Sequence, residues 1–344
     1  MPNLPPLLLL GLLLGGTALS GATPVNPAAS PRVHEVLSYI EGLEARSTAK
    51  ILSGQFTGYE GQLGRPLLEK IHAQTGQWPA LVGVDYADHR KGAVSTRNQN
   101  RTAIDYWRAG GLVSVSAHLY NPANPNGGGM RDQGVDLDAL LSPGTETNKR
   151  WLRELDQIAK GLGELQDAGV VVLWRPFHEM NGSWFWWGGK DPVSFARIWR
   201  HMFEYFTREK KLNNLLWVYS PNHGVNAQAY YPGDDLVDIT GLDAYTNRVN
   251  PEGIQGYPEV AANKKPFGFT EFGPHGAHAP PGDFDYRHFL AGIRVHFTRC
   301  SFFLCWDEKW SPANNLYARE FYNDPLVVNR GGLPAGLAGD RSKP

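Results

Sequence analysis

The feature that most constrains the fold is a recurring run of apolar, β-branched or aromatic residues, each about the length of a strand. Several of these runs are continuous rather than alternating, which is typical of strands covered on both faces by other structure. The pattern predicts eight strands, at residues 51–56, 80–86, 112–119, 170–177, 214–220, 237–245, 266–272 and 301–307.

Helical patterns separate most of the predicted strands. Apolar residues repeat at helical spacing in 151–165, 195–206 and 289–297, whereas the connection 221–235 has little helical pattern. Strands that alternate with helices in this way predict an α/β protein with a single (β/α)8 TIM barrel. A doubly wound open sheet is the alternative, but no glycine-rich phosphate loop follows the first strand.

The beginning of the chain has the features of a signal peptide. Residues 7–14 read LLLLGLLL, and small residues follow up to Ala22. This run is too short to span a bilayer. No Lys or Arg precedes it, so an uncleaved anchor is the alternative. We therefore expect a secreted protein, extracellular or periplasmic.

The predicted signal peptide and barrel strands divide the chain into four parts. We expect residues 1–22 to be the signal peptide, 23–31 a flexible lead-in, 32–330 the (β/α)8 domain that carries the activity, and 331–344 a mobile tail. The loop 121–141 is rich in Gly, Pro and Asn, and it is long enough to act as a functional lid.

Charge and cysteine content exclude several classes of function. The formal net charge is −1, which disfavours binding to nucleic acid and to anionic membranes. Cys300 and Cys305 are too few for a disulfide scaffold or a four-cysteine zinc site. On one strand their Cα atoms would lie about 16 Å apart, beyond the ~7 Å that a disulfide tolerates. We expect two buried thiols, with a bridge across a turn as the alternative, and a monomer without cofactor or metal.

Polar and aromatic residues stand where the predicted strands end. The carboxyl ends of barrel strands form the active face of such a fold. The residues at these ends are His118, Arg175, His178, Glu179, Trp184, Asp243, Tyr245, Glu271 and Trp306. The pattern indicates one site at one end of the barrel.

Glu179 follows the fourth predicted strand and Glu271 lies at the end of the seventh, and these positions face each other across a barrel mouth. Two opposed carboxyl groups are what glycoside hydrolysis needs, one as acid and the other as nucleophile or base. The separation of the two groups decides between retention and inversion, and the sequence does not give it. The alternative is that each glutamate pairs with a basic residue at the rim.

A glycine-bracketed segment, 182–189, contains Trp184, Trp186 and Trp187. The apolar face of a sugar ring stacks on such side chains, whereas a core role would predict periodic spacing. We expect at least one of the three to line the cleft.

The run Trp174-Arg-Pro-Phe-His-Glu-Met-Asn-Gly182, followed by Trp184-Phe-Trp-Trp-Gly188, resembles the signature of glycoside hydrolase family 26. Thr270-Glu-Phe-Gly273 resembles the second signature of that family, and the resemblance extends from about residue 51 to 310. It implies a (β/α)8 barrel and a retaining double displacement. Most members are endo-β-1,4-mannanases acting on mannan, galactomannan or glucomannan, and some act on β-1,3-xylan or mixed-linkage β-glucan.

The resemblance also implies a role for individual residues. Glu179 matches the acid/base and Glu271 the nucleophile. The positions that match sugar-binding or supporting residues are His118, Arg175, His178, Trp184, Asp243, Tyr245 and Trp306. For Arg175 and Asp243 the alternative is a charge pair that stiffens the rim. A β-mannan is the expected partner, and a non-catalytic carbohydrate-binding protein is the alternative of a different class.

Overall fold

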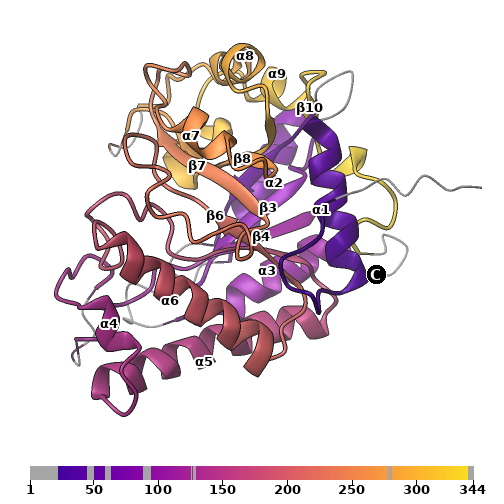
Figure 1. Ribbon diagram of the computed structural model, residues 1–344. Helices are drawn as coiled ribbons and strands as arrows, with labels where there is room; N and C mark the ends of the chain where they lie inside the picture. Colours follow the sequence, from indigo (N-terminus) through magenta and orange to yellow (C-terminus); the bar gives the residue numbers. More distant parts are fainter. Residues whose placement is uncertain are drawn as a thin grey trace, which may run out of the picture.

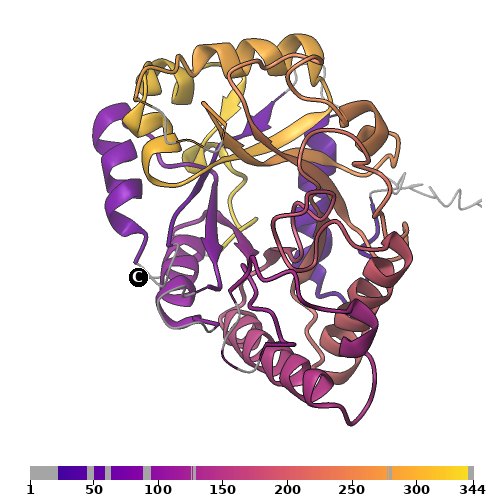
Figure 2. The same ribbon diagram turned by 90° about the vertical axis from the view of Figure 1, so that its left-hand side faces the viewer.

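The computed structural model describes residues 22–44, 50–58, 63–87, 94–124, 126, 129–276, 278 and 281–339. All of the predicted signal peptide except Ala22 lies outside these residues. Figures 1 and 2 show a barrel of strands with helices packed around its outside. Within the described part of the chain, no helix is long and apolar enough to cross a membrane.

Parallel strands close into one barrel because β8 (Phe267–Gly273) pairs with β9 (Cys300–Cys305), which in turn pairs with β2 (Gly54–Phe56). Between β2 and β8 the strands follow in chain order. They are β3 (Leu81–Asp85), β4 (Leu112–Ser116), β5 (Val172–Arg175), β6 (Leu215–Tyr219) and β7 (Ile239–Tyr245). The predicted (β/α)8 barrel is therefore confirmed, and each of its eight strands falls where the apolar runs predicted it.

Two short strands extend this barrel. The first predicted strand is divided at Ser53, so that β1 (Ile51–Leu52) precedes β2. β1 pairs with β9 and with β10 (Val327–Val328), which lies outside the eight-strand ring.

The helices cover the outside of the barrel and one of its ends. They are α1 (Pro31–Glu44), α2 (Arg65–Thr75), α3 (Arg97–Arg108), α4 (Leu137–Leu140), α5 (Glu146–Asp167), α6 (Pro192–Glu204), α7 (Tyr257–Ala261), α8 (Arg287–His296) and α9 (Ala318–Tyr322). The carboxylate of Asp191 accepts from the Ser194 amide and caps α6. The described connection from β6 to β7 contains no helix, in keeping with its weak pattern.

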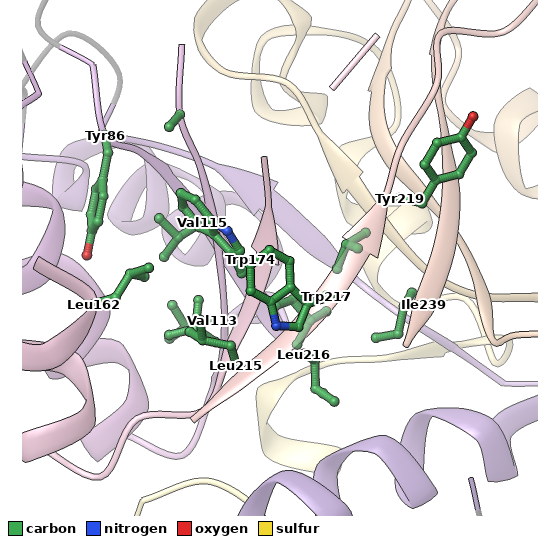
Figure 3. Packing of buried hydrophobic residues seen from close by; sticks show 14 of the residues in the cluster. Tyr86, Val113, Val115, Leu162, Trp174, Leu215, Leu216, Trp217, Tyr219 and Ile239 are labelled. Atoms are coloured by element: carbon green, nitrogen blue, oxygen red, sulfur yellow. The ribbon is translucent and has the colours of Figure 1, made fainter. Parts of the chain in front are cut away.

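Large apolar side chains fill the space between the strands and the outer helices. Figure 3 shows Trp174 and Trp217 close together, on neighbouring strands β5 and β6. Both rings contact Phe206, which follows α6, at centroid distances of 6.0 and 6.2 Å. Complete burial of such side chains contributes about 1.5–3 kcal/mol each. This core fixes the ends of β5 and β6, from which several site residues extend.

The segment expected to be a flexible lead-in instead packs on the amino-terminal end of the barrel. Asn26 is buried, and its side-chain amide donates to the carbonyl of Leu212 at 3.0 Å. The Val25 amide donates to the Asp238 carboxylate at 2.7 Å. Paired, buried polar groups order this segment. At the other end of the chain, residues 331–339 of the expected mobile tail also pack, whereas 340–344 lie outside the described residues.

Cys300 and Cys305 stand at the two ends of β9. Both are buried free thiols. The prediction of two unbridged cysteines is therefore confirmed, and the alternative bridge across a turn is wrong because a strand holds the two residues apart.

Candidate active site

A cavity of about 650 Å³ opens at the carboxyl ends of the barrel strands. Most of the predicted site residues line it, namely His118, His178, Glu179, Trp184, Tyr245, Glu271 and Trp306. The remaining two, Arg175 and Asp243, are fully buried beneath its floor. The structure thus brings together every residue that the sequence placed in the site.

Both carboxylate oxygens of Glu271 accept a hydrogen bond. Tyr245, at the end of β7, donates from its hydroxyl to Oε2 at 2.6 Å. Arg175, at the end of β5, donates from Nη2 to Oε1. Hydrogen bonds to a carboxylate, one of them from a guanidinium, favour its ionised form. Tyr245 and Arg175 therefore fix the carboxyl group of Glu271 at the floor of the cavity.

Arg175 also binds a second carboxylate, that of Asp243, with Nη1 and Oδ2 2.7 Å apart. Burial lowers the pKa of Arg175, but Asp243 and Glu271 more than offset this effect and raise it overall. Asp243 lies at a bulge in the pairing of β7 with β8. Its Oδ1 accepts from the hydroxyls of Ser220 and Thr270 at 2.8 and 2.7 Å. The buried Arg175–Asp243 pair thus supports Glu271 from below rather than stiffening the rim alone.

Glu179 sits on a sharp turn after β5. Its backbone φ is 57°, and Phe177 two residues earlier has a φ of 50°. A non-glycine residue in this left-handed region is strained by about 1–3 kcal/mol, and such strain is concentrated at functional sites. The Glu179 amide donates to the carbonyl of Ser220 at 2.8 Å, which anchors the turn to β6.

Glu179 is only 8% exposed. Its carboxyl group accepts a hydrogen bond from Nε1 of Trp184 at 2.6 Å. Burial raises its pKa well above the ordinary value, and the negative charges of Asp243 and Glu271 raise it further. The Trp184 hydrogen bond opposes this shift. The surroundings of the two glutamates therefore differ: burial and nearby negative charge favour the proton on Glu179, whereas a guanidinium and a hydroxyl donate to Glu271.

An oxygen of Glu179, one of Asp243 and one of Glu271 all lie within 4.8 Å of one another. Such a group of carboxylates could bind a divalent cation. Here, however, the Arg175 guanidinium already bonds two of the three. The positive charge next to these carboxylates is thus supplied by Arg175 of the protein itself.

His118 and His178 form a second polar group on the same floor, with their Nε2 atoms 3.1 Å apart. His118 Nδ1 lies 2.8 Å from Oδ2 of Asp85, which stands at the end of β3. Burial lowers the pKa of His178 well below its ordinary range, and the Arg175 charge lowers it further. His178 is therefore neutral.

Of the three tryptophans in the glycine-bracketed segment, only Trp184 lines the cavity. Trp186 and Trp187 are fully buried. Their indole nitrogens donate to the carbonyls of Leu119 and His178 at 3.0 and 2.8 Å. The expectation that at least one of the three lines the cleft is confirmed, and the other two support the loop from behind.

Sequence reasoning missed several residues of the site. Asp85, Ser220 and Thr270 lie beneath it as hydrogen-bonding partners. The cavity is also lined by Met130 and Arg131 of the predicted lid loop 121–141, by Phe185 of the glycine-bracketed segment, by Asn222 and Asp307 at strand ends, and by His223, Gly276, Glu308 and Trp310. Asp85 could have been found, because it is a charged residue at the end of an otherwise apolar strand. His223, Gly276, Glu308 and Trp310 lie in connecting segments that carry no such pattern.

The barrel and the opposed carboxyl groups of Glu179 and Glu271 at its mouth are features of a glycoside hydrolase. A model of the family described as Glycosyl hydrolase family 26 matches residues 25–332. The chain belongs to glycosyl hydrolase family 26.

Individual relatives agree with this family. A mannan endo-1,4-beta-mannosidase of Bacillus subtilis is 38% identical over 93% of this chain and 93% of its own length. Mannan endo-1,4-beta-mannosidase A and B of Caldalkalibacillus mannanilyticus is 37% identical over 92% of this chain, which spans 64% of that relative's length. The structure of the Bacillus subtilis mannanase BCman superposes with a TM-score of 0.84 at 35% identity, covering 91% of this chain and 97% of that one.

Proposed function

We propose that this glycoside hydrolase is a secreted, retaining endo-β-1,4-mannanase that cleaves mannan, galactomannan or glucomannan by double displacement. The observation that carries the retaining mechanism is the closeness of Glu179 and Glu271, which have oxygens within 4.8 Å of each other. Retaining enzymes separate their two carboxyl groups by about 5–5.5 Å, whereas inverting enzymes need about 6.5–9.5 Å to admit a water molecule.

In the first step, Glu271 attacks the anomeric carbon of the sugar bound over it. The bond from that carbon to the glycosidic oxygen breaks, and Glu179 gives its proton to the departing oxygen. The product is a glycosyl ester of Glu271. Tyr245 and Arg175 hold the Glu271 carboxyl group in place for the attack, and Arg175 takes no part in proton transfer because a guanidinium stays charged.

In the second step, a water molecule attacks the same anomeric carbon. Glu179, now ionised, takes a proton from this water, and the ester bond to Glu271 breaks. Both displacements invert the anomeric carbon, so the overall result is retention. The raised pKa of Glu179 suits both steps, because it makes the group an acid before the first step and a base of useful strength after it.

A β-mannan substrate is supported by the relatives, two of which are mannan endo-1,4-beta-mannosidases. The cavity is consistent with a sugar chain, since the partly exposed rings of Trp184 and Trp306 line it next to the glutamates. Aromatic faces of this kind stack on pyranose rings. Secretion is supported by the apolar run 7–14 and the small residues that follow it. We expect the enzyme to act as a monomer without nucleic-acid or membrane partners.

The experiment that tests this proposal is product analysis by chromatography after incubation with linear β-1,4-mannan, galactomannan, β-1,3-xylan and mixed-linkage β-glucan. The variant Glu271→Ala serves as the blank. We expect manno-oligosaccharides from the wild type alone, in a broad range of early sizes that indicates internal cleavage. If products came only from another glycan, β-mannan would not be the substrate. No product from any of the four would favour a carbohydrate-binding protein.

A further inference from the structure

Three buried side chains form a hydrogen-bonded series that runs from β3 to the cavity. Oδ2 of Asp85 lies 2.8 Å from Nδ1 of His118. Nε2 of His118 lies 3.1 Å from Nε2 of His178. The two histidines line the cavity beside Glu179, whereas Asp85 is only 1% exposed and does not reach it.

Asp85 is held as an anion. Its Oδ1 accepts the backbone N–H of His118 at 3.1 Å, and its Oδ2 also accepts the hydroxyl of Ser116. Burial raises the pKa of Asp85, but its interactions with His118 and Ser116 outweigh burial and lower it to about 2. An ionised carboxylate has no proton to give, so Nδ1 of His118 must carry the hydrogen in their contact.

The proton on His118 Nδ1 determines the next contact. In its neutral form an imidazole has one N–H and one bare nitrogen, so Nε2 of a neutral His118 is the acceptor. The hydrogen between the two rings must then belong to Nε2 of His178. Because His178 is neutral, its Nδ1 is bare, and this buried atom has no hydrogen-bond partner in the structure.

We propose that Asp85 is a positioning residue that fixes the tautomers of both histidines, placing one hydrogen on Nδ1 of His118 and the other on Nε2 of His178. Asp85 acts through His118 and touches no sugar. The two imidazoles consequently offer a defined pattern of donors and acceptors beside Glu179. This inference rests on the proposed function, because it assigns that pattern to the recognition of a sugar.

The substitution Asp85→Asn tests the proposal sharply, because the surroundings fix the orientation of the new amide. The His118 backbone N–H needs an acceptor, so the asparagine oxygen must occupy the position of Oδ1. The NH2 group then faces His118 Nδ1 and donates to it. His118 becomes the Nε2–H tautomer, and its Nε2 donates to His178, which becomes the Nδ1–H tautomer. Replacing one carboxylate oxygen of Asp85 with an NH2 group should therefore reverse the tautomers of both histidines.

The first measurement is the 15N chemical shift of the ring nitrogens in protein labelled at histidine, taken at pH 8. Signals are assigned with the variants His118→Gln and His178→Gln. In the wild type we expect a protonated Nδ1 on His118 and a protonated Nε2 on His178, with both reversed in Asp85→Asn. The opposite tautomers in the wild type would overturn the proposal even if the variant failed to fold.

The second measurement is kcat/KM on β-1,4-mannohexaose. Asp85→Asn should lower it about 10- to 100-fold, by analogy with carboxylates that orient metal-binding histidines. The matched control is Asp238→Asn. Asp238 is another buried carboxylate that accepts two backbone N–H groups, but it lies at the opposite end of the barrel. The control should retain wild-type activity.

The two measurements separate this proposal from the proposed function. Reversed tautomers with unchanged kcat/KM, or lowered kcat/KM with unchanged tautomers, would each overturn the role of Asp85. Failure of the wild type on mannohexaose would overturn the mannanase function. In that case the ring shifts would still report whether Asp85 orders the two histidines.

Discussion

The indole N–H of Trp184 donates to Oε2 of Glu179 at 2.6 Å. A side chain that lines the cavity thus also contacts the group proposed to protonate the leaving oxygen. The hydrogen bond favours the charged carboxylate and partly offsets the rise in the pKa of Glu179 that burial causes. Trp184 therefore has two roles, as a wall for the sugar and as a control on the proton of Glu179.

Replacing Trp184 with Phe separates these roles, since Phe keeps an aromatic face but has no N–H. Loss of the donor raises the pKa of Glu179 further. Because Glu179 must be protonated in the first step, the alkaline limb of the kcat/KM profile should move to higher pH. The matched control is Trp306→Phe, since Trp306 also lines the cavity. An alkaline limb that stays in place in Trp184→Phe would contradict this role.

The two glutamates should respond differently to truncation. Glu179→Ala removes the general acid, and activity on mannan should fall about 10²- to 10⁴-fold. Activity should recover on substrates with a good leaving group, such as aryl mannosides with an acidic phenol, because these need no protonation. Glu271→Ala should be inactive on both, since no covalent ester can form.

Glu320→Ala, at an exposed position on α9, is the control for these measurements. If the activated substrates restored activity to Glu271→Ala rather than to Glu179→Ala, the roles of acid/base and nucleophile would have to be exchanged. Wild-type rates in either variant would rule out its proposed role.

Arg175 should be essential for stability as well as activity. Its removal leaves the carboxylates of Asp243 and Glu271 buried without a cation. Breaking a buried pair in this way costs about 3–5 kcal/mol, so Arg175→Met should lower the free energy of unfolding in urea by that amount. Arg200→Met breaks the exposed pair with Asp235 and should cost less than about 1 kcal/mol. Equal effects of the two substitutions would refute this difference.

Cys300 and Cys305 should be unreactive in the folded protein. Burial raises the pKa of Cys300 to about 12 and that of Cys305 well above its ordinary value, so neither forms a thiolate near neutral pH. Ellman's reagent should detect no thiol in the native enzyme and two thiols after denaturation. Detection of none after denaturation would mean that a disulfide forms.

The sequence predicted the barrel well because the barrel strands are covered on both faces, and several of them read as continuous apolar runs. It also identified the polar residues at the strand ends, since topology alone brings these ends together. The sequence did not show which of Trp184, Trp186 and Trp187 lines the cavity. All three share one loop, and only the path of its backbone decides which ring faces the cavity.

Other features depend on contacts between distant segments. Residues 23–31 have the composition of a linker, yet Asn26 finds a buried partner near residue 212, across the base of the barrel. Asp85 could be placed at the end of a strand, but its link to His118 requires the distance between β3 and the end of β4. A single sequence gives the order of such residues along the chain but not the distances between them in the folded protein.

The most direct test of the central claim is the anomeric configuration of the first product, followed by 1H NMR during cleavage of β-1,4-mannohexaose. With oxygens of Glu179 and Glu271 within 4.8 Å of each other, the account predicts that the β-anomer of the new reducing end appears first and then mutarotates. Initial appearance of the α-anomer would show inversion and contradict the double displacement.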